Sequence, residues 1–274
     1  NMILRPALGT RHADQNRIKG RNEIRKGTDM LQITEHGTTV ELGDVFYNPY
    51  MTPDRDLTIA VLAAFDRTVD SIESYLDTFA ATGIRGLRVA SELKLTVTLN
   101  DRDPDAAYLI RQNIAVTNLQ SSCVVTNMDA NGLPNQRPFV VIEIDPFGSP
   151  VPFLAAASRS AIRLLCIPAT DTAPLCGAHL NAGIRKYASV PMNNEYHVEI
   201  GVRVLMGAIA CALAVQEIAM VPLLAYARRH YVRVYARVLK SVSSADKSMQ
   251  ELGFIAHCRH CRFRTGAQGV GPVI

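Results

Sequence analysis

The chain has 274 residues, of which 48% are hydrophobic, and a formal net charge of +4 at pH 7. That length and composition allow one or two domains with a sizeable core. The N-terminus lacks the apolar core of a secretory signal, and the longest apolar stretch, residues 204–215, is too short to cross a membrane. We therefore expect a cytoplasmic protein with no membrane partner, and a monomer.

Basic residues concentrate in two parts of the chain, residues 5–26 and residues 228–264. Two cationic segments on either side of a more neutral middle suit a polyanion that touches the protein at separate places. The alternative is an ordinary solvated surface, with a disordered N-terminal arm over residues 1–27.

The first predicted elements are a hairpin and a helix. Residues 30–34 and 38–42 favour β structure and are separated by a short Gly-containing loop, a pattern that predicts a β-hairpin. Apolar residues at helical spacing over 57–65 predict a helix, with Asp54 or Asp56 at its N-terminus.

Strands and helices then alternate along the chain. We predict strands over 72–79, 95–99, 122–126, 139–144 and 165–167, and helices over 87–92, 105–116 and 153–164. Strands separated by helices at this spacing predict an α/β fold with a parallel sheet and right-handed crossovers. A long helix over 198–220 closes this unit. Pro222 marks the predicted boundary between a domain of residues 28–221 and a second domain of residues 222–274.

Strict alternation over residues 230–238 predicts a strand with two unlike faces. One face carries small apolar residues, and the other carries Tyr231, Arg233, Tyr235 and Arg237. Alternating Tyr and Arg suit a surface that stacks bases and neutralises phosphates, so these four residues are candidate RNA contacts. An amphipathic strand whose aromatic rings pack against a neighbour fits the same pattern.

The tetrapeptide Asp145-Pro146-Phe147-Gly148 follows the apolar run of residues 139–144, which predicts a buried parallel strand. It places a carboxylate and an aromatic ring at the carboxyl end of the strand, where open α/β sheets bind ligands. A carboxylate accepts hydrogen bonds from an amine, and a ring stacks on a flat base. The pairing suits chemistry on the exocyclic amine of a nucleobase, although a capped turn with a core Phe fits equally well.

Other strand ends also carry polar residues or glycine. Gly83 and Gly86 form a turn after the first strand of the alternating series, Asp101 follows the second and Asp129 follows the third. An acidic residue at the spacing of Asp101 holds ribose hydroxyls in dinucleotide-binding folds. The turn lacks the Gly-x-Gly-x-x-Gly pattern that cradles a pyrophosphate. We therefore expect an adenosyl ligand without phosphates, of which S-adenosylmethionine is the common one.

The same residues belong to a longer series of motifs: Val45-Phe46-Tyr47-Asn48-Pro49, Asp54-Arg55-Asp56, Ala81-Thr82-Gly83-Ile84-Arg85-Gly86-Leu87-Arg88, Leu99-Asn100-Asp101, Asp129-Ala130-Asn131, Asp145-Pro146-Phe147-Gly148-Ser149-Pro150, Ala169-Thr170-Asp171-Thr172-Ala173-Pro174-Leu175-Cys176-Gly177 and Arg185-Lys186-Tyr187. Over residues 28–256 the chain resembles the archaeal and eukaryotic tRNA (guanine-N2)-dimethyltransferases, which modify the guanine at position 26 of tRNA. That family usually has Asn where this chain has Asp54.

The resemblance implies a class I S-adenosylmethionine-dependent methyltransferase (Rossmann-like) domain, followed by the start of a smaller α+β C-terminal domain that binds tRNA. It also implies the roles of the site residues. The residues that would contact the methyl donor are Arg55, Arg85, Asp101, Asp129 and Ala130.

The implied reaction is methylation of the guanine N2 amine of tRNA, first to the mono- and then to the dimethyl product. Asp145 and the Pro146 carbonyl would accept the N2 hydrogens, while Phe147 stacks on a base flipped out of the tRNA. The alternatives are an exocyclic-amine methyltransferase that acts on rRNA or adenine, and an RNA-binding relative without catalysis.

Cys258 and Cys261 have the spacing of half a zinc site, and His257 and His260 add potential ligands. Many members of the family carry a second Cys pair shortly afterwards, whereas none follows here. Either the zinc site is incomplete in this chain, or its remaining ligands belong to a loop and a C-terminal segment outside this sequence.

Overall fold

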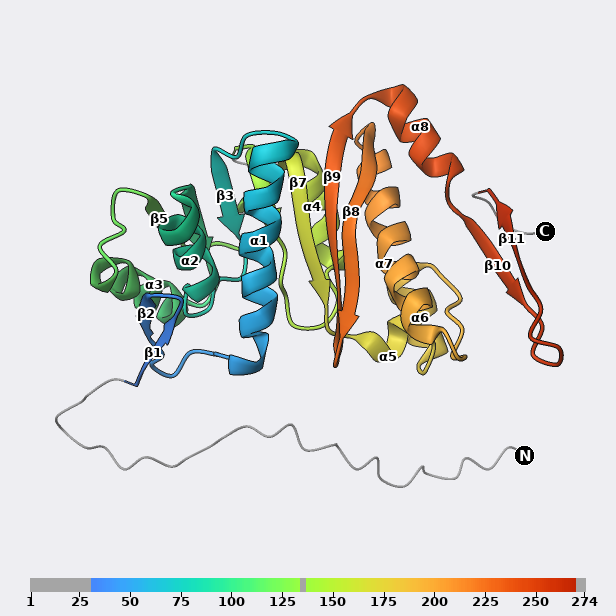
Figure 1. Ribbon diagram of the computed structural model, residues 1–274, viewed down its shortest axis with the longest axis horizontal. Helices are drawn as coiled ribbons and strands as arrows, with labels where there is room; N and C mark the ends of the chain where they lie inside the picture. The colour runs from blue at the N-terminus through green and yellow to red at the C-terminus, as the bar shows by residue number, and fades with distance from the viewer. Residues whose placement is uncertain (1–30, 134–136, 270–274) are drawn as a thin grey trace, which may run out of the picture. The chain divides into compact units, whose positions relative to one another are not determined.

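Apolar segments between residues 74 and 240 form the strands of one central sheet (Figure 1). The computed structural model describes residues 31–133 and 137–269, so the predicted arm of residues 1–27 lies outside the described part. The strands are β3 Ser74–Asp77, β4 Thr96–Asn100, β5 Cys123–Thr126, β6 Phe139–Glu143, β7 Ala161–Ala169, β8 Ile218–Arg228 and β9 Tyr231–Lys240. Their order across the sheet is β5-β4-β3-β6-β7-β9-β8.

The strands from β5 to β7 are parallel, and β9 runs antiparallel to both β7 and β8. This confirms the predicted α/β fold. The helices are α1 Thr52–Thr68, α2 Ile84–Leu93, α3 Pro104–Val116, α4 Val151–Ser160, α5 Thr172–Leu175, α6 Leu180–Tyr187, α7 His197–Ala214 and α8 Val242–Gln250, with a 3-10 turn η1 at Pro49–Met51. Two hairpins flank this unit in sequence: β1 Gln32–Glu35 with β2 Thr38–Glu41, as predicted, and β10 Gly253–His257 with β11 Arg264–Gln268.

Alternate residues of each central strand point to opposite faces of the sheet, and both faces are covered. In β7, Leu164 packs in the layer that includes α1, α2 and α3, whereas Leu165 packs in the layer that includes α4 and α7. In β9, Tyr235 and Val234 divide in the same way. The result is a three-layer molecule in which helices enclose a sheet without a solvated face at its centre.

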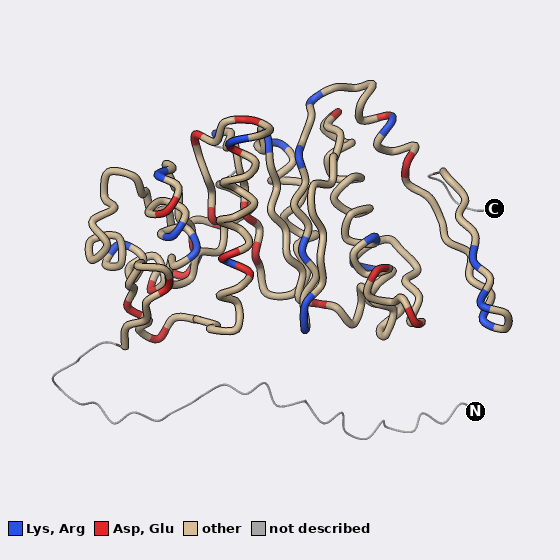
Figure 2. Tube along the Cα trace, viewed as in Figure 1, with Lys and Arg blue, Asp and Glu red and all other residues tan. Residues whose placement is uncertain are grey.

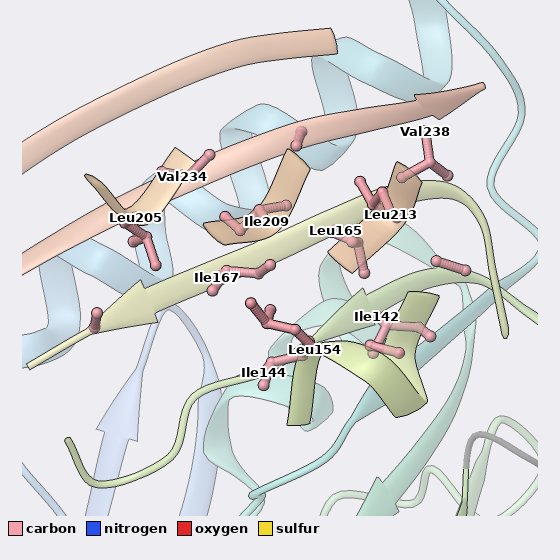
Figure 3. Packing of buried hydrophobic residues seen from close by; sticks show 14 of the residues in the cluster. Ile142, Ile144, Leu154, Leu165, Ile167, Leu205, Ile209, Leu213, Val234 and Val238 are labelled. Carbon is pink, nitrogen blue, oxygen red and sulfur yellow. The ribbon is translucent and has the colours of Figure 1, made fainter. Parts of the chain in front are cut away.

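The second of these layers contains α7, the one helix in the described part of the chain that is long and apolar enough to cross a membrane. Figure 3 shows that Leu205, Ile209 and Leu213 from α7 pack together with Leu165 and Val234 from the sheet. Burial of one such side chain contributes about 1.5–3 kcal/mol. The apolar character of α7 is therefore explained by the core that it covers.

Two predicted helices end earlier in the structure. The helix expected over 153–164 stops at Ser160, because Ala161 already begins β7, and the helix expected over 198–220 stops at Ala214, before β8 begins at Ile218. Continuous apolar runs have no period that separates a buried helix from a buried strand. Local pattern alone therefore could not place these two boundaries.

The predicted domain boundary at Pro222 is wrong, because β8 runs through this residue and pairs with β9 on both sides of it. The register shifts between Pro222 and Leu224, which is the kind of irregularity that accommodates a proline. β8 is the edge strand of the sheet, where a missing N–H breaks no ladder on the outer side. Residues 222–240 thus complete the sheet, and α8 and the β10–β11 hairpin come after it in the chain.

Candidate active site

The carboxyl ends of β3, β4 and β6 open into a cavity of about 550 Å³, within the size range of small-molecule sites. Asp101, Asp129 and Asp145 all line it, together with Arg55, Arg85 and Ala130. The predicted convergence of carboxylates from neighbouring strand ends on one cavity is therefore confirmed. Phe46 and Tyr47, from the segment between β2 and η1, line the same cavity.

The turn after β3 brings main chain close to the cavity. Ala81 and Gly83 both have positive φ, 50° and 84°, and the Asp101 carboxylate accepts a hydrogen bond from the Ala81 N–H at 3.0 Å. A Cβ on Gly86 would lie 2.9 Å from Leu99 Cδ2, so glycine at this position lets α2 approach β4. Of the two glycines predicted to form the turn, Gly83 precedes α2, whereas Gly86 lies within the helix. The hydrogen bond from Ala81 links the turn to the carboxylate at the end of the next strand.

The two acidic residues that follow β4 and β5, Asp101 and Asp129, are held by local backbone. Asp101 also accepts from the Asp103 N–H at 3.0 Å, and Asp129 accepts from the Asn131 N–H at 2.8 Å. Asn100 is fully buried and its side-chain amide donates to the carbonyls of Thr78 and Met128. That amide, for which no role was predicted, links the ends of β3, β4 and β5 and so fixes the spacing of the site.

Asp145 forms an ion pair with Arg85, whose Nη2 lies 2.6 Å from its Oδ2. The Arg85 Nη1 donates to Asp54 Oδ2 at 3.0 Å and to Thr58 Oγ1 at 3.1 Å. The side chain of Asp145 is 22% exposed, whereas that of Arg85 is 9% exposed. Arg85 lies in the cavity wall, and the contact with the methyl donor that the resemblance implied stays a prediction. Its hydrogen bonds in the structure orient the candidate catalytic carboxylate.

Beneath this pair lies a buried network of charges. Arg233 donates to Asp54 Oδ2 at 2.9 Å and to both oxygens of Glu143 at 2.6 and 2.7 Å. Burial raises the pKa of Glu143 despite its arginine neighbours. Burial also tends to raise the pKa of Asp54, but the charges of Arg233 and Arg85 outweigh burial, so the pKa of this carboxyl is lowered. Asp54 lies in the first turn of α1, near the helix N-terminus as predicted, but its carboxylate binds these arginines and makes no cap.

The predicted RNA-binding face of β9 is wrong. Tyr231, Arg233 and Tyr235 are 6%, 0% and 0% exposed, and Arg237 is half-buried. The reason is that β9 lies between β7 and β8 with α1 across this face, where the Tyr235 hydroxyl is 3.1 Å from Thr58 Oγ1. The alternation predicted the two faces correctly but could not show that α1 covers the polar one.

Arg55 belongs to a second buried ion pair at the cavity wall. Its Nε donates to Glu35 Oε2 at 2.9 Å, and its Nη2 bonds Glu35, Thr52 and the Asn48 carbonyl. Burial opposes ionisation of Glu35, but the hydrogen bonds and charge of Arg55 hold its pKa at about 2. Among the described residues no hydrogen bond uses the Arg55 Nη1, which leaves one donor of this cavity-lining side chain for a ligand.

Asp77 is a cavity residue that was not predicted from the sequence. It ends β3, is 1% exposed, and neither of its carboxylate oxygens has a hydrogen-bond partner in the described part of the chain. Burial raises its pKa to about 7, with Glu143 and Asp145 adding repulsion and Arg85 opposing it. The available signal was a lone Asp at the end of an apolar strand directly before a glycine-containing turn.

Two aromatic rings stand at the mouth of the cavity. Phe147 is 82% exposed and Phe46 is 55% exposed, and their centroids lie 4.9 Å apart at an interplanar angle of 88°. Two exposed rings in contact with each other at the mouth of a cavity form an apolar patch of the kind that marks ligand sites. Phe147 was a predicted site residue, whereas Phe46 was noted only as part of a motif.

The cysteine pair gives no support for zinc. Cys258 and Cys261 are exposed near the tip of the β10–β11 hairpin, where the Cys258 N–H donates to the Phe263 carbonyl at 2.8 Å. Among residues 31–133 and 137–269, no three His, Cys, Asp or Glu side chains come together in a group that could hold a metal ion. A closed structural zinc site needs four ligands.

Known proteins provide an independent comparison. A tRNA (guanine(26)-N(2))-dimethyltransferase of Methanosarcina mazei is 48% identical over 233 residues, which are 82% of this chain and 60% of that protein. One of Methanosphaerula palustris is 44% identical over 257 residues, 89% of this chain and 67% of that protein. The chain thus spans about three fifths to two thirds of the length of these relatives.

The fold agrees with that comparison. The structure of Trm1 from Pyrococcus horikoshii in complex with S-adenosyl-L-methionine is 33% identical, with a TM-score of 0.84, over 89% of this chain and 71% of that one. The family model for N2,N2-dimethylguanosine tRNA methyltransferases matches residues 27–273. The chain therefore belongs to the N2,N2-dimethylguanosine tRNA methyltransferase family.

Proposed function

We propose that this chain carries the catalytic site of an S-adenosylmethionine-dependent tRNA methyltransferase that acts on the N2 amine of guanine 26. The observation that carries the proposal is the single cavity that joins Asp101, Asp129 and Asp145, with the exposed Phe147 at its mouth. Related chains named for this activity support it. Because the chain spans only part of those proteins, the activity, the substrate and the partner are all proposals here.

The adenosyl half of the donor fits the β4 and β5 side of the cavity. Asp101 would accept hydrogen bonds from the ribose hydroxyls, as an acidic residue at this strand end does in related folds. Asp129, with Ala130 beside it, would meet the amino edge of the adenine. Backbone N–H groups already bond both carboxylate oxygens of Asp101 and one oxygen of Asp129, so the two side chains are oriented before the ligand arrives.

The amino-acid half of the donor fits the β3 side. Asp77 is a buried carboxylate without a hydrogen-bond partner in the described residues, and an ammonium group would satisfy it. The unused Nη1 of Arg55 would hold the donor carboxylate. When bound, the donor supplies an electrophilic methyl group on a sulfonium centre.

The other end of the cavity suits the guanine. Phe46 and Phe147 would enclose the base, which must leave its stack at a cost of a few kcal/mol. Asp145 and the Pro146 carbonyl would accept the two N2 hydrogens and turn the nitrogen lone pair toward the methyl group. The new N–C bond forms as the S–C bond breaks, and Asp145 accepts the proton that leaves N2.

The test is incubation of unmodified tRNA transcripts with a labelled methyl donor, followed by nucleoside mass spectrometry. We expect N2-methylguanosine and N2,N2-dimethylguanosine, and no label in a transcript with adenine at position 26. Label in methyladenosine, or label that persists after the guanine-to-adenine change, would overturn the assignment of the target base.

A further inference from the structure

The turn between β8 and β9 carries three consecutive basic or titratable side chains, Arg228, Arg229 and His230, all of them exposed. We propose that this turn, together with Tyr50, binds the phosphate backbone of the tRNA beside the flipped guanine. The inference rests on the proposed function and deepens it, because it assigns a contact surface for the substrate that the buried face of β9 does not provide.

The β8–β9 turn lies at the same edge of the sheet as the cavity. Val232 pairs with Ala169 at the carboxyl end of β7, so the turn extends beyond that end. Thr170, the next residue after β7, lines the cavity. In Figure 2 the cationic tip of the β8–β9 pair lies at the same edge of the sheet as the carboxyl end of β7. The turn is therefore close to the place where a nucleotide would enter.

The charges of the turn are not neutralised by neighbouring acids. Arg85 and Arg233 are buried and each pairs with carboxylates. In contrast, no ion pair joins Arg228 or Arg229 to an acidic group in residues 31–133 and 137–269. An exposed guanidinium without a carboxylate partner is free to form charge-assisted bonds to a phosphate.

The turn is also anchored to the buried charge network beneath the cavity. The Tyr226 hydroxyl at its base donates to Asp54 Oδ1 at 2.6 Å, and its ring packs edge-on against Tyr231 with centroids 5.9 Å apart. At the tip, the Arg229 guanidinium lies 4.7 Å from the centroid of the Tyr50 ring. A guanidinium that stacks through its face keeps its in-plane N–H groups for a phosphate.

Tyr50 connects this turn to the aromatic mouth of the cavity. It is 68% exposed and belongs to η1, four residues after Phe46. A backbone phosphate held by Arg229 would therefore lie next to the segment that would enclose the base. Such a contact would help to offset the cost of extruding the base.

The negative charge on the opposite side of the cavity indicates the side from which the tRNA would approach. Asp103, Asp105 and Asp129 are exposed around the ends of β4 and β5, where they outnumber Arg102. A polyanion is repelled on that side and attracted on the side of the β8–β9 turn. The small donor and the large RNA would thus reach the same cavity from different sides.

The experiment measures tRNA binding by the Arg228→Gln/Arg229→Gln double variant at several salt concentrations, without the methyl donor. We expect about tenfold weaker binding, with the slope of log K against log salt reduced by about 0.7–0.9 for each lost phosphate contact. The Arg228→Lys/Arg229→Lys variant retains the charge and should keep the slope. Donor affinity, measured by calorimetry, and Tm should stay at the wild-type values in both variants.

Arg67→Gln is the matched control, because Arg67 is an exposed arginine in the last turn of α1, at the other end of that helix from η1. If the Gln double variant binds tRNA with the affinity and salt slope of the Arg67→Gln control, the inference is wrong. If wild-type protein shows the predicted salt slope but transfers no methyl group to tRNA, the proposed function fails and the binding surface stands. Should the double variant unfold, Tyr50→Leu tests the same surface and should weaken tRNA binding alone.

Discussion

Arg85 Nη2 and Asp145 Oδ2 lie 2.6 Å apart, and this ion pair connects the cavity to a charge network inside the protein. Arg85 also bonds Asp54, which in turn bonds Arg233 from β9 at the far side of α1. The orientation of the carboxylate at the proposed reaction centre therefore depends on Asp54 and Arg233, two residues that do not line the cavity.

Arg85→Lys should lower the turnover number by about a hundredfold with little change in the KM for the donor. A lysine ammonium is a point charge and cannot bond Asp54, Thr58 and Asp145 in the geometry of a planar fork, so Asp145 loses its orientation. Steady-state kinetics on tRNA transcripts would measure the turnover number and the KM for the donor. Arg88→Lys, which alters a buried ion pair on the same helix without contact to Asp145, should keep most of the turnover number. Equal losses in both variants would show that general damage to α2 is the cause.

Arg233→Met should reduce the free energy of unfolding by about 3–5 kcal/mol, because it leaves Asp54 and Glu143 buried with only Arg85 as their cation. Urea denaturation followed by circular dichroism would measure the loss. Arg237→Met is the matched control, since Arg237 lies on the same face of β9 but makes no ion pair in the described part of the chain. A loss under about 1 kcal/mol for Arg233→Met would refute the structural role of this network.

The free energy of unfolding of the unliganded protein should depend on pH because of Asp77. Its pKa is raised from 3.8 to about 7, so between these values the folded protein holds a proton that the unfolded chain has released. The contribution of Asp77 is therefore fully present below pH 3.8 and is lost as the pH rises through 7. Asp77→Asn should remove this dependence and raise Tm above that of wild type at a pH above 7. Parallel pH profiles for the two proteins would contradict the prediction.

Phe46→Leu should lower kcat/KM for tRNA by about tenfold or more, because it removes one of the two rings that are proposed to contact the base. The affinity for the donor, measured by calorimetry, should change little. Phe254→Leu removes a ring that is 48% exposed on β10 and serves as the control. A Phe46→Leu variant with the kinetics of the control would show that Phe46 does not contact the base.

The sequence was sufficient to predict the parallel sheet and the convergence of Asp101, Asp129 and Asp145, because strand ends in an α/β fold share one edge. The sequence was not sufficient to predict that Arg233 is buried in an ion-pair network. Alternation along β9 separated a polar from an apolar face, but only tertiary structure shows that α1 covers the polar one. Asp77 was missed for a related reason, since the feature that marks this carboxylate is the lack of a hydrogen-bond partner among the described residues.

The β8 strand shows a further limit. The predicted first domain ended before Pro222, and the sequence alone does not show that an edge strand of the sheet runs through this proline. The position of β8 at the edge results from the long-range pairing of β9 with β7, which leaves β8 on the outer side of β9. The sequence likewise showed that the residues of the turn between the two strands are basic, but it did not show where this turn lies relative to the cavity.

The most direct test of the proposed mechanism is single-turnover methyl transfer by Asp145→Asn. The amide keeps the shape of the site but cannot accept a proton as a carboxylate does, so transfer to guanine 26 should fall by about a hundredfold or more, while the donor affinity stays near that of wild type. An Asp145→Asn variant that retains about a tenth of the wild-type transfer rate with normal donor binding would contradict the central claim that this carboxylate acts on the guanine amine.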